Sequence, residues 1–302
     1  MYQIKRWYLM LTGKSISHVN QDIGKYFSKN EILGYYNNLT EKVIKQRDLL
    51  GTDRLPEVNT ATTKILFPVA VFQYGLGAYD LYLASGDKMY ERKFLQCANW
   101  ALDVQDSQGR WNNFFFYRPE TPYGAMAQGE GASLLIRAYK HTLDVNYLDA
   151  ALRALKFMLL PLELGGTTKY ENGESYLMEY TFKGMVLNGA IFAWWGLYDY
   201  VTLTSDREEM YDAMLSTLHS IIHVLPQFKS KLWSMYSLDG LISSPFYHNL
   251  HIAQMQAMYK LTEKPIFDEY AKLWIKRQNN ILNKSLAFIY KSIQKIFERN
   301  DS

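Results

Sequence analysis

LFPVAVFQYGLGAYDLYLASGDKMYERKFLQCANWAL, residues 66–102, holds two predicted helices joined by one short turn. The run before SGDKMY is apolar with a helical period, and the run after it is amphipathic. Ser and Asp within the turn are common N-cap residues, so they mark the start of the second helix. This stretch therefore predicts a helical hairpin.

The same turn pattern occurs four times along the chain, as SGDKMY (85–90), TLDVNY (142–147), TSDREEMY (204–211) and TEKPIF (262–267). The repeat is longer than the roughly 34 residues of a tetratricopeptide repeat because long links separate the pairs. Trp, Tyr, Phe, Gly and Pro are common in these links, which are residues 106–123, 161–181 and 226–249. Short turns on one rim and long aromatic loops on the other predict an all-α fold, an incomplete (α/α) toroid or barrel whose cleft the long loops line.

We expect three units along the chain. Residues 1–60 are predicted to be a largely helical extension packed on the toroid, and residues 61–280 form the toroid itself. Residues 281–302 include a basic amphipathic helix with Leu282 and Leu286 on its apolar face. Docking of this helix on the core is the favoured interpretation, with membrane-surface or partner binding as the alternative.

The composition argues against a nucleic-acid-binding protein. The 302 residues carry a formal net charge of +3, from 33 Lys and Arg against 30 Asp and Glu, which is too small for a basic footprint. Cys97 is the single cysteine, so no internal disulfide is expected. No apolar stretch reaches the roughly 20 residues of a membrane span. We expect a cytoplasmic protein, with a homodimer as one candidate assembly.

The second and third long loops carry residues suited to proton transfer. Glu179 and Tyr180 stand side by side, and a carboxylate can take or relay the proton of a neighbouring phenol. Tyr236 and Tyr247 follow in the third loop. A phenol with an unperturbed pKa of about 10 can act as acid or base when a C–H proton has to move, and its ring can stack on a sugar.

His248 and His251 follow Tyr247 at a spacing that places both on one helix face. Zinc is one interpretation of this pair, but no third His, Cys or carboxylate stands at ligand spacing. A hydrogen-bonded or core role is the other interpretation. We therefore expect neither a metal nor any other cofactor.

From the residues alone, three functions stay open. The first is a hydrolase that uses paired carboxylates, and the second is an enzyme that abstracts a proton next to a carbonyl or carboxylate. The third is a non-catalytic glycan-binding or interaction module with tyrosines as stacking platforms. The carboxylates available to the hydrolase are Asp106, Glu130, Glu171, Glu174, Glu179 and Asp239.

The segment YGAMAQGEGASLLIRAY, residues 123–139, resembles a segment of the D-glucuronyl C5-epimerases. Further segments resemble the same family in the same order: FPVAVFQYGLGAYD (67–80), MEYTFKGMVLNGAIFAWWGLYDY (178–200), WSMYSL (233–238) and YHNLHIAQMQAMYKLTEKPIFDEYAKLWIKR (247–277). The resemblance covers residues 67–277, the catalytic domain of that family. It implies conversion of glucuronate to iduronate within a uronate-containing polysaccharide such as heparosan.

The resemblance also implies residue roles. The family's Glu–Tyr pair matches Glu179 and Tyr180, its Tyr-His-x-x-His segment begins at Tyr247, and its intervening tyrosine matches Tyr236. Tyr180, assisted by Glu179, and Tyr247 would remove the C5 proton from one face and return it from the other, with Tyr236 supporting the intermediate. The implied reaction needs no redox cofactor or metal.

Contacts to the substrate are expected from polar and cationic residues in the same blocks and loops. Gln128, Asn188 and His248 are candidates for sugar or carboxylate contacts. Cations for the substrate carboxylate are sought among Arg110, Arg118, Lys169, Lys183, His248 and His251. Animal members have arginines where this chain has YSLDG (236–240) and SSPFYH (243–248). If those arginines contact the anionic polymer, the difference implies either a less charged polymer or different cations for its carboxylates. A β-eliminating uronate lyase and a non-catalytic glycan-binding relative are the alternatives to an epimerase.

Overall fold

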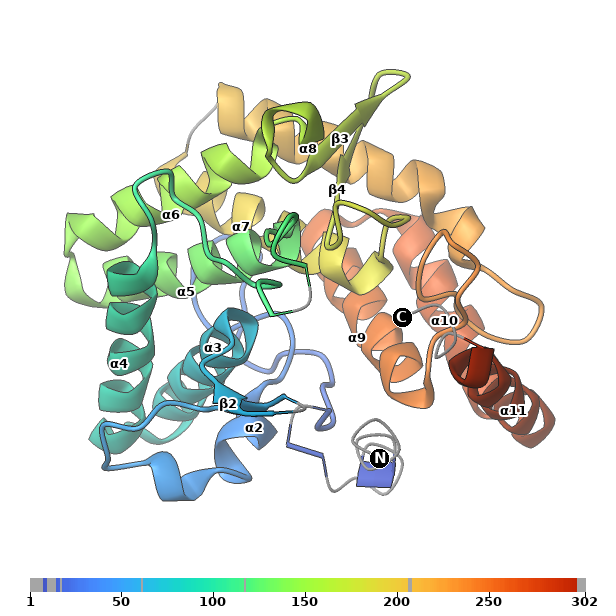
Figure 1. The fold of residues 1–302 in the computed structure, drawn as a ribbon, viewed down its shortest axis with the longest axis horizontal. Helices are drawn as coiled ribbons and strands as arrows, with labels where there is room; N and C mark the ends of the chain where they lie inside the picture. The colour runs from blue at the N-terminus through green and yellow to red at the C-terminus, as the bar shows by residue number, and fades with distance from the viewer. Residues whose placement is uncertain are drawn as a thin grey trace.

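The computed structural model describes residues 8–9, 15–16, 18–60, 62–116, 118–205 and 208–297. Figure 1 shows helical hairpins side by side along a curve. The four hairpins pair α3 (Pro68–Ser85) with α4 (Lys88–Val104), α5 (Ala125–Thr142) with α6 (Val145–Leu159), α7 (Leu187–Thr204) with α8 (Glu209–Val224), and α9 (Pro245–Thr262) with α10 (Pro265–Gln278). The predicted incomplete (α/α) toroid is confirmed.

The first helix of each hairpin lies on the inside of the curve. The inner helices pack in chain order, α3 on α5, α5 on α7, and α7 on α9. Glycines allow the closest of these approaches, because a Cβ on Gly129 of α5 would stand 2.4 Å from the Cα of Ala193 on α7. The core thus runs along the inner helices, and the outer helices cover it with their apolar faces.

The four short turns share one backbone geometry. The residue after each inner helix is left-handed, and these residues are Gly86, Leu143, Ser205 and Glu263. The Ser or Thr before each one bonds its hydroxyl to the carbonyl four residues back, at Ser85, Thr142, Thr204 and Thr262. These hydroxyls therefore close the inner helix, and the predicted caps of the second helix are confirmed only at Asp87 and Asp144. Residues 206–207 of the third turn lie outside the described residues.

The expectation of a largely helical N-terminal extension is wrong for residues 18–60. Its helices there are α2 (Thr40–Ile44) and the 3₁₀ helix η1 (Arg47–Leu49), and β1 (Val58–Asn59) pairs with β2 (Lys64–Ile65). Asn, Asp, Ser and Gly recur through residues 20–38 and favour turns over helix. Tyr35, Tyr36 and Leu39 are nevertheless fully buried, so this part of the segment packs against the rest of the protein. Residues 1–7, 10–14 and 17 lie outside the described residues.

The link at residues 161–181 is more ordered than predicted. It contains the 3₁₀ helix η2 (Leu162–Leu164) and an antiparallel hairpin of β3 (Thr168–Glu171) and β4 (Glu174–Leu177). Asn172 and Gly173 form the turn with φ of 52° and 80°, the signature of an Asn-Gly hairpin turn that the sequence carried. The hairpin packs on α8, and α7 begins at Leu187.

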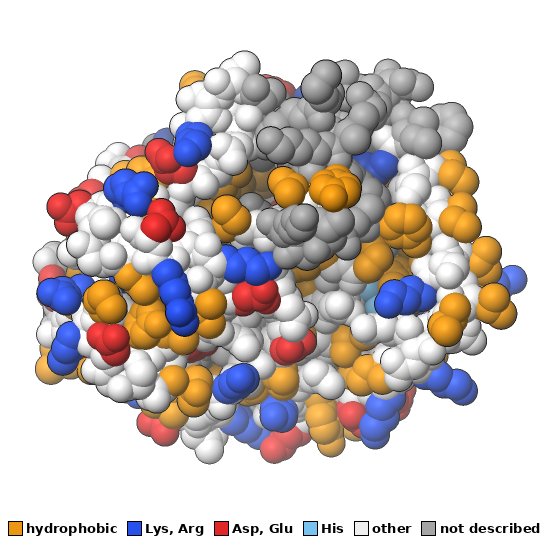
Figure 2. All heavy atoms as spheres, turned by 90° about the horizontal axis from the view of Figure 1, so that it is seen from below, with side chains coloured by type: hydrophobic (Ala, Val, Ile, Leu, Met, Phe, Trp, Pro, Cys, Tyr) orange, Lys and Arg blue, Asp and Glu red, His pale blue; other side chains and the backbone are white. Residues whose placement is uncertain are grey.

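The C-terminal helix α11 (Ile281–Phe297) docks through a face other than the predicted one. Ala287 is buried, and Gln294 bonds the backbone of Ile242 and Gly240 in the loop between the 3₁₀ helix η3 (Leu225–Phe228) and α9. The predicted apolar face is half-exposed or more, with Leu282 at 73% and Leu286 at 49%. Figure 2 shows apolar side chains gathered on the side of the molecule where α11 lies. The side chain of Phe297 and residues 298–302 lie outside the described residues.

No helix among the described residues is both long and apolar enough to cross a bilayer. The three-unit division of the chain stays a prediction.

Candidate active site

A cavity of about 930 Å³ lies at the N-terminal ends of the inner helices. Its lining takes Gln73 from α3, Met126 from α5, Asn188 from α7 and Tyr247 from α9, all within the first two turns of their helices. Unpaired backbone N–H groups and aligned peptide dipoles make helix N-termini favourable for negative charge. Four such ends around one cavity favour an anionic ligand.

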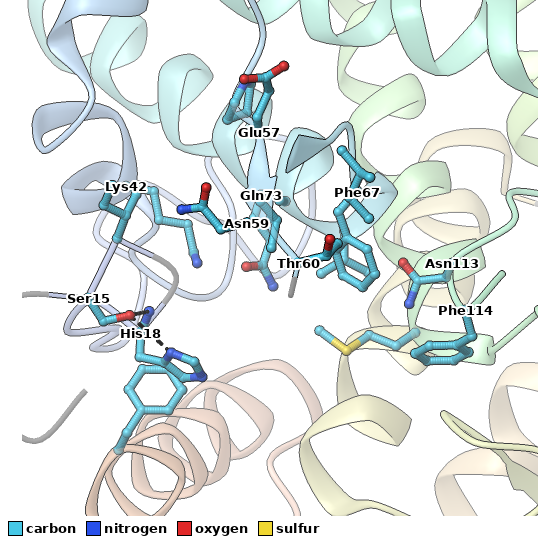
Figure 3. Close-up of a pocket in the computed structure, with 18 of the residues that line it drawn as sticks. Ser15, His18, Lys42, Glu57, Asn59, Thr60, Phe67, Gln73, Asn113 and Phe114 are labelled. Atoms are coloured by element: carbon cyan, nitrogen blue, oxygen red, sulfur yellow. Dashed lines mark hydrogen bonds between the residues drawn. The ribbon is translucent and has the colours of Figure 1, made fainter. Parts of the chain in front are cut away.

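The long loops and the N-terminal segment complete the lining. Asn113 and Phe114 come from the link before α5, and Glu179 and Tyr180 from the link before α7, which confirms that aromatic loops line the cleft. The opposite wall comes from residues 15–62, including Ser15, His18, Lys42 and Asn59 (Figure 3). The cavity is therefore built by two parts of the chain that are far apart in sequence.

Glu179 and three tyrosines form one polar cluster. The Tyr236 hydroxyl donates to Tyr180, and the Tyr180 hydroxyl donates to the Glu179 carboxylate. The ring of Tyr236 lies 4.8 Å from that of Tyr247 between centroids. The structure thus brings together all four residues that the sequence placed in proton transfer.

Two glycines make room for Glu179. A Cβ on Gly189, in the first turn of α7, would stand 2.3 Å from Glu179 Oε2, and one on Gly124, before α5, would stand 2.1 Å from the Glu179 carbonyl oxygen. The carboxylate is consequently held against the start of α7. Burial raises the pKa of Glu179 to about 7, and the hydrogen bond from Tyr180 partly opposes this shift. A carboxyl with this pKa can exchange a proton near neutral pH.

The tyrosines are fixed by aromatic neighbours. Tyr180 stacks on Phe114 at 4.9 Å, and Tyr247 meets the edges of Phe246 and His18. Burial first, and then the nearby Glu179, raise the pKa of Tyr236 well above its usual value. Tyr236 therefore stays a neutral hydrogen-bond donor.

Several lining residues bury polar atoms that lack a hydrogen-bond partner among the described residues. Unpaired buried polar atoms are unfavourable in a closed core and are common where a ligand supplies the partner. The atoms are Gln21 Oε1, Asn113 Oδ1, Glu179 Oε2 and Asn188 Oδ1. Asn188 thus lies where the sequence predicted a substrate contact.

His248 and His251 lie in the core instead of the cavity. The Nδ1 atom of each ring is hydrogen-bonded to the Ser234 hydroxyl, at 2.8 Å for His248 and 2.9 Å for His251. His248 also stacks on Trp233. Burial lowers the pKa of each to about 3, so neither carries charge for a substrate carboxylate. The structure does not bring the two histidines to the cavity, and their hydrogen bonds tie α9, which carries Tyr247, to the loop that carries Tyr236.

The remaining predicted contacts also lie outside the lining. Arg110 pairs with Asp106 at 2.6 Å, Arg118 pairs with Glu120 at 3.5 Å, and Lys169 on β3 pairs with Glu171 at 2.8 Å. Gln128 is fully buried on α5 and donates to the Trp111 carbonyl. The structure does not bring these four residues to the cavity.

The carboxylates proposed for a hydrolase do not face each other across the cavity. Glu179 is the member of that set that lines it, and Glu130 accepts a hydrogen bond from the lining residue Gln73. Burial raises the pKa of Glu130 to about 8. The others have structural partners: Asp106 and Glu171 pair as above, Glu174 bonds His223, and Asp239 caps Gly184. In the described part of the chain, no three His, Cys, Asp or Glu side chains gather as metal ligands.

Sequence reasoning missed Lys42 and Gln73. Lys42 lies in the N-terminal segment, outside the resemblance, and nothing in its local pattern marks it. Gln73 did carry a signal, because it is a polar residue inside an otherwise apolar helical run.

The fold and the site define an (α/α) toroid protein with a carboxylate–phenol chain in a cavity at the inner helix N-termini. Within this class, residues 105–276, more than half of the chain, match the family model described as D-glucuronyl C5-epimerase C-terminus. The chain belongs to this family.

Two relatives are similar over part of their length. The D-glucuronyl C5-epimerase of Caenorhabditis elegans is 26% identical over 216 residues, which is 62% of this chain and 35% of the worm protein. An uncharacterized protein of Methanocaldococcus jannaschii is 32% identical over 157 residues, or 50% of this chain and 51% of the archaeal protein.

Solved structures resemble the chain more distantly. An α-1,6-mannanase of Salegentibacter superposes with a TM-score of 0.48 at 12% identity, over 80% of this chain and 67% of the mannanase. A family 76 glycoside hydrolase from Bacteroides thetaiotaomicron superposes with a TM-score of 0.47 at 12% identity, over 75% of this chain and 54% of the hydrolase.

Proposed function

We propose that this protein is a uronate C5-epimerase that acts on D-glucuronate residues within a polysaccharide and converts them to L-iduronate. The observation that carries the proposal is the hydrogen-bonded chain from Tyr236 through Tyr180 to Glu179, beside Tyr247, in a cavity suited to anions. Family membership supports the same chemistry.

The proposed reaction begins at Tyr180. Glu179 takes the phenolic proton while the Tyr180 oxygen takes the C5 proton of the uronate, and the C5–H electron pair moves into the carboxylate. Tyr247 then donates its proton to C5 from the other face, which inverts the centre. At this point Tyr180 is protonated again, Glu179 holds an extra proton and Tyr247 is a phenolate. Proton exchange through the cluster and solvent takes the proton from Glu179 and returns one to Tyr247, so the reaction has no net redox change.

The intermediate is the main energetic obstacle, because loss of the C5 proton adds a second negative charge to the carboxylate. Preorganised donors in a water-poor site stabilise such charge more strongly than water does. The N-terminal ends of the inner helices are the donors that we assign to this task, and the neutral hydroxyl of Tyr236 supports the reaction through its hydrogen bond to Tyr180.

A polymer of the heparosan type is the proposed substrate. Aromatic rings at the lining, Phe114 and Tyr180 among them, offer faces on which pyranose rings stack, and the amides of Gln73, Asn113 and Asn188 offer hydrogen bonds to hydroxyls.

The test is incubation of heparosan, hyaluronan and unsulfated chondroitin with the protein in D2O, followed by NMR of C5. We expect deuterium at C5 together with new iduronate signals in at least one polymer. Unsaturated uronate ends would instead identify a β-eliminating lyase, which shares the C5 deprotonation. Binding with neither deuterium nor cleavage would leave a glycan-binding protein and refute the enzyme.

A further inference from the structure

Lys42 is the one lysine or arginine that lines the cavity in the described part of the chain. It is 6% exposed, and Figure 3 shows it on the wall opposite Phe114. Of the cations that the sequence favoured, Arg110, Arg118 and Lys169 are paired with Asp106, Glu120 and Glu171. Lys183 lies 5.5 Å from the centre of the Tyr180 ring, behind the lining, and lowers the pKa of Glu179. The cavity therefore receives its basic side chain from the N-terminal segment.

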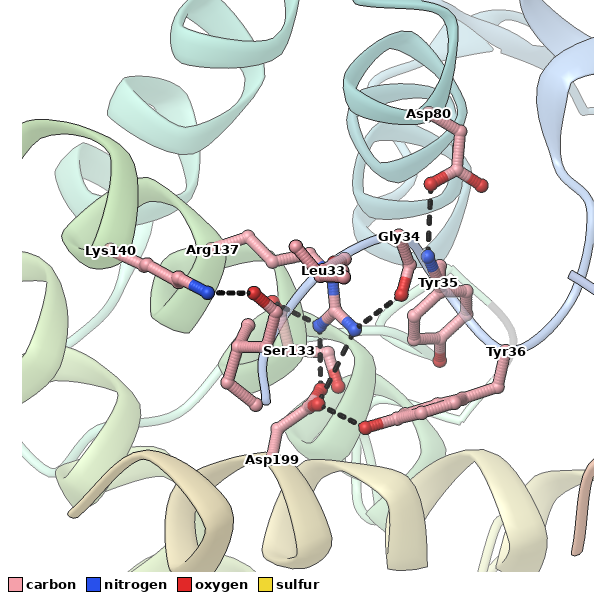
Figure 4. Close-up of polar contacts among 10 residues, drawn as sticks. Leu33, Gly34, Tyr35, Tyr36, Asp80, Ser133, Arg137, Lys140 and Asp199 are labelled. Atoms are coloured by element: carbon pink, nitrogen blue, oxygen red, sulfur yellow. Dashed lines mark hydrogen bonds and ion pairs between the residues drawn. The ribbon is translucent and has the colours of Figure 1, made fainter. Parts of the chain in front are cut away.

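The segment that carries Lys42, residues 32–44, is here called the strap. Figure 4 shows how it is held: Arg137 of α5 donates to the carbonyls of Leu33 and Gly34, at 2.9 Å and 3.1 Å, and pairs with Asp199 of α7 at 2.6 Å. The Tyr36 hydroxyl donates to Asp199 at 2.5 Å. Both charged side chains of this anchor are fully buried, so the strap is fixed against two inner helices.

The end of the strap is seated just as closely. Leu39 packs directly on α3: a Cβ added to Gly77 would stand only 2.5 Å from the Leu39 carbonyl oxygen. Val43 is fully buried. With Leu39 and Val43 on the core side of α2, Lys42 extends into the cavity near Gln73. The position of its amine is thus set by packing at both neighbours.

Burial of this amine is unfavourable for the folded protein. Desolvation lowers the pKa of Lys42 to about 8, and the carboxyls of Glu130 and Glu41 only partly oppose this. The other titratable groups that share the lining are His18, Glu57, Glu179, Tyr180 and Tyr247. At neutral pH the amine is still mostly charged, so it places a positive charge at the cavity, where an anionic ligand would be attracted.

We propose that Lys42 binds the carboxylate of the reacting uronate, beside the Gln73 amide, and neutralises the charge that develops there when C5 loses its proton. This inference rests on the proposed function and adds that the strap, outside the 105–276 family match, completes the active site. No covalent bond to Lys42 forms, and its proton stays on the amine.

The experiment compares Lys42→Met, Lys42→Arg and Lys45→Met with the wild-type chain in the D2O exchange assay on heparosan. Lys45→Met is the matched control, because it removes the same charge three residues further on, just after the strap, where Lys45 pairs with Glu41 at 3.0 Å. We expect kcat/KM for C5 exchange to fall about 10²–10³-fold in Lys42→Met, as for loss of one oxyanion donor. Lys45→Met should stay within about 2-fold of wild type.

Two further readouts separate charge neutralisation from a structural role. Lys42→Met should melt at or above the wild-type temperature, because it removes a buried charge. Lys42→Arg should keep most of the activity and move the alkaline fall of kcat/KM to higher pH, because an arginine stays charged well above pH 8. Carboxyl-reduced heparosan should compete with heparosan equally well in wild type and Lys42→Met, since it lacks the carboxylate.

Failure of the inference is distinguishable from failure of the proposed function. Near-normal exchange by Lys42→Met, with wild type active, overturns the role of Lys42 and leaves the epimerase in place. If the alkaline fall of kcat/KM occurs at the same pH in Lys42→Arg as in wild type, the role of Lys42 is likewise overturned and the epimerase stays in place. Absence of C5 exchange by wild type on every uronate polymer overturns both.

Discussion

Two buried polar clusters lie within the same toroid, and they differ in how completely their groups are paired. In the anchor, all three guanidinium nitrogens of Arg137 and both oxygens of Asp199 have partners. In the cavity, Glu179 Oε2 and Asn188 Oδ1 have none among the described residues. A buried polar cluster with a structural role needs a hydrogen-bond partner for every polar atom. Buried polar atoms without partners next to a cavity indicate a place for a ligand. Substitutions should therefore affect stability in the first cluster and activity in the second.

The largest expected effect is the loss of activity in Tyr180→Phe and Tyr247→Phe. Each removes one hydroxyl from the cavity, so C5 exchange should fall about 10²–10⁴-fold, the usual contribution of a positioned acid or base. Stability should change little because the rings and their aromatic contacts remain. Tyr259→Phe, on the exposed part of α9, is the control and should keep full activity. Near-normal exchange in both cavity variants would remove these tyrosines as proton carriers.

The next effect is on stability, at the anchor. Asp199→Asn leaves Arg137 as a buried cation without its counter-ion, and we expect the free energy of unfolding to fall by about 3–5 kcal/mol. Urea unfolding followed by far-UV circular dichroism measures this. Asp268→Asn, which breaks the exposed pair with Lys272, should change it by less than about 1 kcal/mol. Equal losses in the two variants would show that the anchor is not structural.

The smallest expected effect is a gain in stability, whereas most substitutions of buried residues destabilise the fold. Burial raises the pKa of Glu179 from 4.5 to about 7, so the folded protein binds more protons than the unfolded chain between these values. The buried carboxylate therefore destabilises the fold fully above pH 7 and not at all below pH 4.5. Glu179→Gln should be more stable than wild type at pH 8, by on the order of 1–3 kcal/mol, and should lose this advantage near pH 4.5.

Paired urea melts at pH 4.5 and pH 8 test this prediction. A stability difference that is the same at both values would contradict the raised pKa. In the exchange assay, wild-type activity should rise between pH 6 and 8 as Glu179 ionises, because only the carboxylate can take the proton of Tyr180.

Most of the toroid and part of the site could be predicted from the sequence. Recurring Ser/Thr turns and helical periodicity are local signals, and they predicted all four hairpins. Glu179, Tyr180 and Tyr236 lie in the loops before α7 and α9, and Tyr247 lies in the first turn of α9. They were predictable because the N-terminal ends of these two helices converge at the cavity.

The rest depended on contacts between distant residues. His248 and His251 read as site residues because they adjoin Tyr247, yet a helix turns both toward Trp233 and Trp274. Lys42 lies on α2, the short helix at the end of a strap that Arg137 and Asp199 hold against two inner helices, and no local pattern encodes those distant contacts. The sequence identified an apolar face on α11, but we expected that face to dock on the core and the structure exposes much of it. Amphipathicity alone does not specify which side of a helix meets the core.

The anchor also has a consequence for the order of folding. Arg137 comes from the second hairpin and Asp199 from the third, so the seat of the strap does not exist until α5 and α7 have paired. Although residues 32–44 leave the ribosome before either helix, they can dock only after both are made. The seat of the buried amine thus depends on two helices that come later in the chain, and a toroid in which α5 and α7 have not paired lacks the anchor that positions Lys42.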